Sequence, residues 1–200
     1  MQDETYDEFT APIDDRYLED YTEGARYRFG EESVDAEEIL EFARRYDPQS
    51  IHTDPEAAAA GPFGGLIASG WQTAALMMRL FADNYLTSVA SLASPGIDEL
   101  RWVRPLRPGD RLTLLCETTG VRPSRTKPDR GVLTTDVTLV NQDGDPILTA
   151  TAMNMVARRG WPGPPGADVT TDPGPTRGRP RGYRRGVRWK TGSSRLVRRA

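Results

Sequence analysis

The chain has 200 residues, a length that suits one domain or one domain with a tail. Its net charge of −3 combines an acidic body with a basic end: residues 1–156 carry 14 Lys and Arg against 27 Asp and Glu, and residues 157–200 carry 12 against 2. A single cysteine, Cys116, excludes an internal disulfide and a cysteine metal cluster and fits a reducing compartment. The N-terminus lacks the basic and apolar regions of a signal peptide, so we expect a cytoplasmic protein.

The beginning of the chain predicts little regular structure. Residues 1–15 are polar and acidic, and we expect a flexible N-terminus before a domain that spans residues 16–159. Residues 25–30 and 33–34 are expected to form short edge strands with a break at Gly30.

A helix is expected next, because Asp35 with Glu38 three residues later is typical of a capped helix start. An apolar stripe at helical spacing continues to Tyr46. Pro48 lacks an amide donor and biases Asp47 away from the helical conformation, so this helix should end at Tyr46.

The segment that follows contains the only histidine of the chain, His52, in a stretch that we expect not to be regular helix. Asp54 before a proline predicts a short capped helix, which a glycine-rich stretch at residues 61–65 interrupts. The apolar run at residues 66–86 then predicts a long helix that is buried nearly all round, and its polar residues argue against a membrane span. An acid and an imidazole therefore precede a buried helix that begins near a glycine, Gly70, which is a plausible active site.

After this helix the pattern changes to strands. Residues 94–96 (Ser-Pro-Gly) are expected to form a turn, and about four antiparallel strands should follow, at residues 97–104, 111–118, 132–141 and 146–157. A sheet curled around one apolar helix would bury both the helix and the one-faced strands, so the pattern predicts an α+β fold.

The central stretch resembles the MaoC-like dehydratases, the family of (R)-specific enoyl-CoA hydratases with a hot-dog fold. That family has the motif Asp-x-Asn-Pro-x-His-x-Asp, then a glycine-rich linker and Ile-Ala-His-Gly. The matching residues here are Asp47, His52, Asp54 and Ile67-Ala68-Ser69-Gly70. Gln49, Ser50 and Ser69 replace the usual Asn, Pro and His. The resemblance extends over about residues 17–159 and implies a hot-dog fold, with an antiparallel sheet wrapped around one long central helix.

The resemblance also implies a reaction, the addition of water to a 2-enoyl thioester or its reversal, on coenzyme A or acyl carrier protein. Asp47 would be the base, His52 would position the same water and help return a proton, and the Gly70 N–H would meet the thioester oxygen. The resemblance further implies a homodimer without metal or redox cofactor. A hot-dog thioesterase and a non-catalytic acyl-CoA-binding subunit are the alternatives.

Other residues carry weaker signals. Gln49 and Gly65 are candidate substrate contacts; Ser69 either binds substrate or only caps the helix, and Met78 is core or the wall of an acyl pocket. One histidine with loop carboxylates is a poor set for a transition metal. The basic loop at residues 121–131 either meets coenzyme A phosphates or is a solvated turn. Residues 160–200, rich in Gly, Pro and Arg, predict a disordered basic tail, for which we do not expect nucleic acid as a partner.

Overall fold

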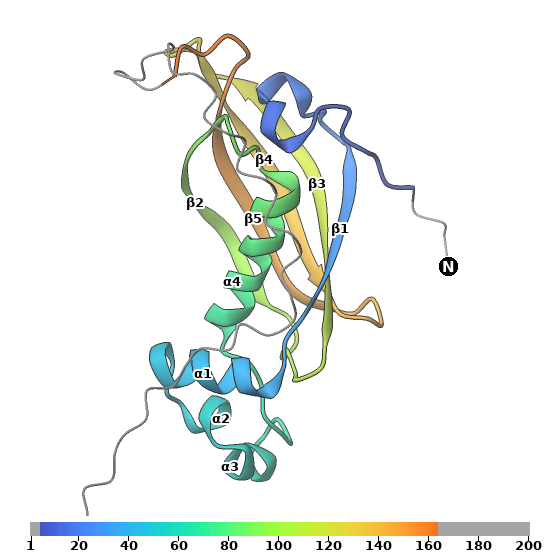
Figure 1. Cartoon of the computed structure of the whole chain (residues 1–200), viewed down its shortest axis with the longest axis vertical. Helices are drawn as coiled ribbons and strands as arrows, with labels where there is room; N and C mark the ends of the chain where they lie inside the picture. Colours follow the sequence, from blue (N-terminus) through green and yellow to red (C-terminus); the bar gives the residue numbers. More distant parts are fainter. Residues whose placement is uncertain (1–4, 164–200) are drawn as a thin grey trace, which may run out of the picture. The chain divides into compact units, whose positions relative to one another are not determined.

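The computed structural model describes residues 5–163, and most of the predicted tail lies outside the described residues. Five antiparallel strands form one sheet in the order β1-β3-β4-β5-β2, and helix α4 lies along one face of it (Figure 1). The strands are β1 (Arg26–Ser33), β2 (Ser91–Trp102), β3 (Arg111–Pro123), β4 (Arg130–Val140) and β5 (Pro146–Ala157). This arrangement confirms the predicted α+β class and the hot-dog architecture.

The helices begin where the sequence places their caps. They are α1 (Ala36–Tyr46), α2 (Ser50–Thr53), α3 (Pro55–Ala60) and α4 (Gly70–Leu80), which continues as a π-helical turn over Phe81–Tyr85. At the start of α1, Asp35 and Glu38 form a reciprocal capping box, and α1 ends at Tyr46 as predicted. The Asp54 side chain caps α3 by accepting hydrogen bonds from the two backbone amides of Glu56 and Ala57.

The segment around His52 differs from the expectation of an irregular turn. His52 lies in the single helical turn α2, whose N-cap is Gln49. The backbone amides of His52 and Thr53 both donate to the Gln49 carbonyl. Pro48 ends one helix without preventing the next, because a proline placed just before a helical turn blocks none of the amides of that turn.

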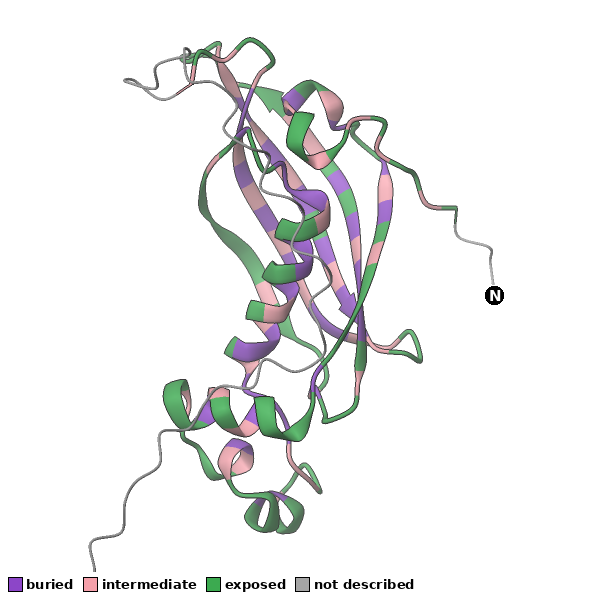
Figure 2. Ribbon diagram, in the orientation of Figure 1, coloured by how far each residue is buried: buried purple, intermediate pink, exposed green. Residues whose placement is uncertain are grey.

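Helix α4 is buried on one side only, which corrects the prediction that it is buried nearly all round. Figure 2 shows exposed residues along one side of α4 and buried ones on the side that faces the sheet. Met77, Leu80 and Phe81 belong to the core, whereas Trp71 is 63% and Met78 40% exposed. The five strands cover one face of the helix, and nothing among residues 5–163 covers the other.

Alternation along the strands places the core between the sheet and α4. On β3, Leu112, Leu114 and Cys116 are buried on one face, as predicted. Strand β5 has the predicted bounds and a similar alternation. The predicted turn at residues 94–96 is wrong, because β2 runs through it with a register shift between Ala93 and Gly96. A proline is tolerated there because β2 is an edge strand and the irregularity removes the need for its amide.

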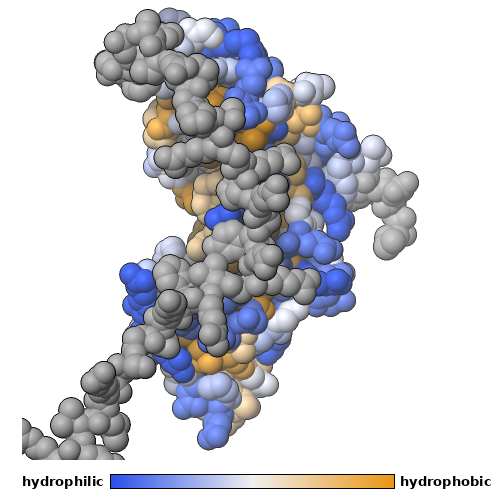
Figure 3. All heavy atoms as spheres, viewed as in Figure 1, coloured by the Kyte–Doolittle hydropathy of each residue, from blue (hydrophilic) through white to orange (hydrophobic). Residues whose placement is uncertain are grey.

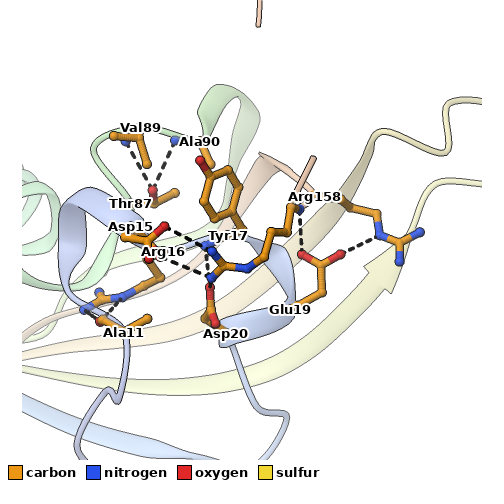
Figure 4. A network of polar contacts seen from close by, with 11 residues as sticks. Ala11, Asp15, Arg16, Tyr17, Glu19, Asp20, Thr87, Val89, Ala90 and Arg158 are labelled. Atoms are coloured by element: carbon orange, nitrogen blue, oxygen red, sulfur yellow. Dashed lines mark hydrogen bonds and ion pairs between the residues drawn. The ribbon is translucent and has the colours of Figure 1, made fainter. Parts of the chain in front are cut away.

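The N-terminal segment is fixed to the end of β5 by charged contacts that the sequence did not predict. Two 3-10 turns, Ile13–Asp15 and Leu18–Asp20, provide acidic side chains. Glu19 accepts a hydrogen bond of 2.8 Å from Arg158 (Figure 4), and Arg159 bonds to Asp15 and Asp20. The Phe9 ring also stacks on Tyr27, with centroids 4.1 Å apart. Residues 9–20 thus make packed contacts with the domain.

Candidate active site

The carboxylate of Asp47 is held at the end of α1 by two side-chain donors. Asp47 is the C-cap residue of α1, with backbone angles φ −150° and ψ 71° outside the helical region. Its Oδ2 atom accepts a hydrogen bond of 2.6 Å from the Ser69 hydroxyl, and its Oδ1 atom accepts one of 2.7 Å from the Gln49 amide. These two bonds lower the pKa of Asp47 from its ordinary value, and the bond from Ser69 has the largest effect. Partial burial acts in the opposite direction, and the nearby His52 lowers the pKa a little further. Asp47 is therefore an ionised acceptor at neutral pH.

The imidazole of His52 faces the same carboxylate oxygen. His52 is buried, and its Nδ1 atom lies 2.9 Å from the Ile67 carbonyl oxygen. A carbonyl oxygen only accepts, so Nδ1 carries the hydrogen and Nε2 of the neutral ring has a lone pair. Nε2 lies 3.5 Å from Oδ2 of Asp47. When the imidazole is neutral, the two side chains thus present two acceptor atoms to one small region.

Ser69 connects this pair to the beginning of α4. It is fully buried, and its hydroxyl oxygen accepts from the Trp71 backbone amide as the N-cap of α4. The Ser69 oxygen accepts from the Trp71 amide, and the Ser69 hydroxyl hydrogen is donated to Asp47. Ser69 is therefore a helix cap, one of its two predicted roles, that also orients the carboxylate; contact with substrate stays a prediction.

Gly70 is the first residue of α4, and an indole ring packs directly against it. The Trp102 indole N–H donates a hydrogen bond of 2.7 Å to the Gly70 carbonyl oxygen. A Cβ atom at Gly70 would lie 2.6 Å from the Trp102 ring, so any larger residue would displace the indole. The Gly70 backbone N–H, in contrast, has no hydrogen-bond partner among residues 5–163. An amide at a helix N-terminus is a donor for an anionic oxygen.

The structure brings five of the predicted site residues together and leaves two apart. Asp47, Gln49, His52, Ser69 and Gly70 form one connected group. Gly65 lies instead beside the guanidinium of Arg107, which donates to the Phe63 carbonyl. Met78 lies eight residues after Gly70 on α4 and is exposed, so it is not part of the core; its other predicted role, as a wall of the acyl pocket, stays a prediction.

Some site features were not predicted from the sequence, and one predicted feature lies elsewhere. The sequence placed Trp102 in a strand but did not predict its contact with Gly70. The two residues are 32 positions apart, and only the tertiary fold brings them together. The basic loop between β3 and β4 lies at the end of the sheet away from α1–α3 (Figure 1). At roughly 3.3 Å per residue, the loop lies about 40 Å from Arg111, the residue at the opposite end of β3. Within residues 5–163, no three His, Cys, Asp or Glu side chains are grouped so as to hold a metal ion.

Known proteins resemble this chain in sequence and structure. The family model of the MaoC-like domain matches residues 20–141, more than half of the chain. The uncharacterised Bacillus subtilis protein YdeM is 30% identical over 62% of this chain and 87% of its own length. The 3-hydroxyacyl-thioester dehydratase Z of Mycobacterium tuberculosis is 40% identical over 44% of this chain, a match that spans 60% of that protein. The crystal structure of a MaoC-like dehydratase from Rhodospirillum rubrum has a TM-score of 0.67 and 39% identity, covering 72% of this chain and 98% of that one.

Proposed function

The chain belongs to the MaoC-like domain family, and on that premise we propose that it hydrates a 2-enoyl thioester, or dehydrates the 3-hydroxyacyl thioester, with Asp47 and His52 activating the water. Family membership supports a hydro-lyase type of activity, because the family contains hydratases and dehydratases. The acyl group is carried by coenzyme A or by acyl carrier protein.

The observation that carries this proposal is the pair of acceptors that converge between α1 and α2. Oδ2 of Asp47 and Nε2 of His52 are 3.5 Å apart, and the Ile67 carbonyl fixes the tautomer that leaves Nε2 free to accept. A water has two O–H groups, so it can donate one to each acceptor and keep an oxygen lone pair for attack. A hydration reaction needs a water held by two directional hydrogen bonds. A histidine with only a structural role would be satisfied by the single bond from Nδ1 and would not need Nε2 to face a carboxylate.

The proposed reaction follows from these roles. As the water oxygen bonds to C3 of the enoyl group, its proton passes to the Asp47–His52 pair. The electron pair of the double bond shifts to C2 and negative charge develops on the thioester oxygen. The N–H of Gly70 would stabilise that charge, and its position at the positive end of the α4 dipole supports this role. The proton held by the pair is returned to C2, so water is added across the double bond and the enzyme regains its first protonation state.

The open side of α4 supports a second part of the proposal, that the protein works as a homodimer. Four large apolar side chains are exposed on α4 and on the edge strand β2: Trp71, Met78, Ile97 and Trp102. Hydrophobic residues are visible on the face that carries α4 (Figure 3). Trp71 and Trp102 contact one another edge to face, with ring centroids 5.5 Å apart, and join the two elements into one apolar surface. A second copy that pairs through α4 and β2 would bury this surface, which a monomer leaves in water.

The activity is tested with purified protein and a series of 2-enoyl-CoA substrates. We expect the absorbance of the conjugated thioester to fall without release of free thiol. Release of thiol would instead indicate a thioesterase, and binding without any change in absorbance would indicate a non-catalytic acyl-CoA-binding protein. Either result would overturn the hydratase proposal.

The dimer is tested by light scattering coupled to size-exclusion chromatography. Met78→Arg places a charge on the exposed apolar side of α4 and should convert the dimer to monomer. Glu23→Arg, in an exposed turn before β1, is the matched control and should leave the mass unchanged. A monomeric wild-type protein at assay concentration, or a dimeric Met78→Arg protein, would contradict this interface.

A further inference from the structure

A buried amide oxygen on α4 has no hydrogen-bond partner among residues 5–163, and it belongs to a residue one helical turn after Ser69, which bonds to Asp47. The Gln72 residue is only 6% exposed, and its Oε1 atom has no hydrogen bond with any residue among 5–163. A buried amide oxygen that is not hydrogen-bonded destabilises a folded protein, so each such group calls for an explanation. Of the other buried residues of α4, Met77 and Leu80 are apolar and offer no donor.

The position of Gln72 on the helix directs it to the site. Gln72 is three residues after Ser69, and residues three apart lie on the same face of a helix. Ser69 is the residue of that face that donates to Asp47. Cα–Cβ bonds of an α-helix tilt toward its N-terminus, so the Cα–Cβ bond of Gln72 is directed toward the end of α4 that Ser69 caps.

The neighbouring polar residue does not compete for the same role. Thr73 is also buried at the start of α4, but its hydroxyl donates a bond of 3.2 Å to the Ser69 carbonyl. Gln72 is thus the polar side chain of this helix turn whose oxygen has no partner within residues 5–163. It lies about 4.5 Å further along the helix axis than Ser69, at 1.5 Å per residue.

We infer that Gln72 selects the acyl group, and that the preferred substrate carries a hydroxyl on the acyl chain beyond the two reacting carbons. This inference rests on the proposed function, because it assigns the reacting carbons to Asp47 and His52. In this arrangement C3 lies next to that pair, and the rest of the acyl chain follows the turn of α4 that holds Gln72. The substrate hydroxyl would donate to Oε1 of Gln72. A site with a buried acceptor disfavours a chain that cannot satisfy it, which makes the pocket selective for a hydroxylated chain.

The experiment compares 2-enoyl-CoA substrates of equal length with no substituent or with one hydroxyl at C4, C5, C6 or C7. We expect kcat/KM of the wild-type protein to be higher by about tenfold or more for one hydroxylated member than for the unsubstituted chain. In Gln72→Leu, a change of similar volume, that preference should disappear or reverse. Calorimetry with the saturated analogues should show the same preference in the dissociation constants, and it is independent of turnover.

The chain provides a matched control at the other end of the sheet. Asn154 on β5 is also buried, and its Oδ1 atom likewise has no partner within residues 5–163. It lies three residues before Ala157, whose amide bonds to Ala90 beyond the end of α4. Asn154→Leu removes a comparable orphan oxygen and should leave the hydroxyl preference intact. Both leucine variants should unfold at the wild-type temperature or above it, because each removes an unpaired buried polar atom.

The outcomes separate the two proposals. Hydration of all chains without a hydroxyl preference, or a preference that survives in Gln72→Leu, overturns the role of Gln72 and leaves the hydratase proposal standing. An equal loss of preference in Asn154→Leu also overturns it, since the effect is then not local. If no chain is hydrated, the proposed function fails. If calorimetry then also finds no tighter binding of a hydroxylated analogue, the role of Gln72 is overturned as well.

Discussion

Replacing Asp47 by Asn tests the base without removing its surroundings. The Ser69 hydroxyl donates to Oδ2, and the amide of Gln49 donates to Oδ1. An Asn side chain can direct its oxygen to Ser69, and the exposed Gln49 amide can turn to accept from the new NH₂ group. Hydrogen bonds to a charged group contribute more than neutral ones, by about 1 kcal/mol, so stability should fall by roughly that amount. For a domain of this size the melting temperature should drop by about 2–4 °C.

The effect on turnover should be far larger than the effect on stability. Asn has no basic oxygen, so kcat should fall by roughly 10² or more, the scale of a general acid–base group. His52→Ala should lower kcat on the same scale, and the double variant should be much less impaired than the product of the two single effects, because both residues hold one water. Initial rates of loss of the enoyl thioester absorbance measure all three.

The matched control for this experiment is Asp54→Asn. Asp54 is exposed and caps α3 seven residues further on, and Asn is as good an N-cap as Asp. This variant should keep both stability and turnover. Near-wild-type hydration by a folded Asp47→Asn protein would remove Asp47 from the mechanism and leave it only as the residue that ends α1.

Three further predictions follow from the same contacts. Ser69→Ala removes the main cause of the lowered pKa of Asp47, so that pKa should rise. The acid limb of the kcat/KM profile should then move to higher pH. Because a lowered pKa stabilises the folded state above the ordinary pKa and that gain is lost as the pH falls through the lowered value, Ser69→Ala should also be less stable than wild type at neutral pH, measured by urea unfolding. Gly70→Ala should cost about 1–3 kcal/mol through the clash with Trp102, and Trp102→Ala should relieve part of that cost in a double-mutant cycle of unfolding free energies. Truncation after Gly163 should leave the melting temperature unchanged, whereas truncation after Arg159 should lower it, because Trp161 packs against the core.

Features determined by neighbouring residues were predictable from the sequence. The caps at Asp35 and Asp54 depend on amides two or three residues away, and both caps formed as expected. Strand β5 was also predicted with its observed bounds, because an alternating strand between a hairpin turn and an arginine pair has clear ends. The approach of Asp47 to His52 was suggested by their spacing and by the family resemblance, since both lie on one short segment.

Features determined by distant residues were not predictable in the same way. Asp47 and Ser69 are 22 residues apart, and no local pattern indicates that the Ser69 hydroxyl donates to the Asp47 carboxylate. The outer face of α4 looked like core because apolar residues cover the whole helix, yet which face is covered depends on how far the sheet extends. The prediction of a turn at the Ser-Pro-Gly stretch, which lies in β2, was wrong for a related reason. The same residues that form turns also form the irregularities of an edge strand, and only the pairing with β5 distinguishes them.

The glycine at the start of α4 shows why a matching motif residue does not by itself establish a catalytic role. Gly70 is required by packing alone, since the Trp102 indole occupies the space that a Cβ atom would need. Its role toward the thioester depends on a different atom, the backbone N–H, which any amino acid except proline would also provide. The two requirements are therefore separable: a larger residue at position 70 perturbs the indole but keeps the amide donor. A loss of activity in such a variant would report the displacement of Trp102 and of the start of α4. The oxyanion role instead requires the Gly70 amide, which has no partner among residues 5–163 and lies at the helix N-terminus.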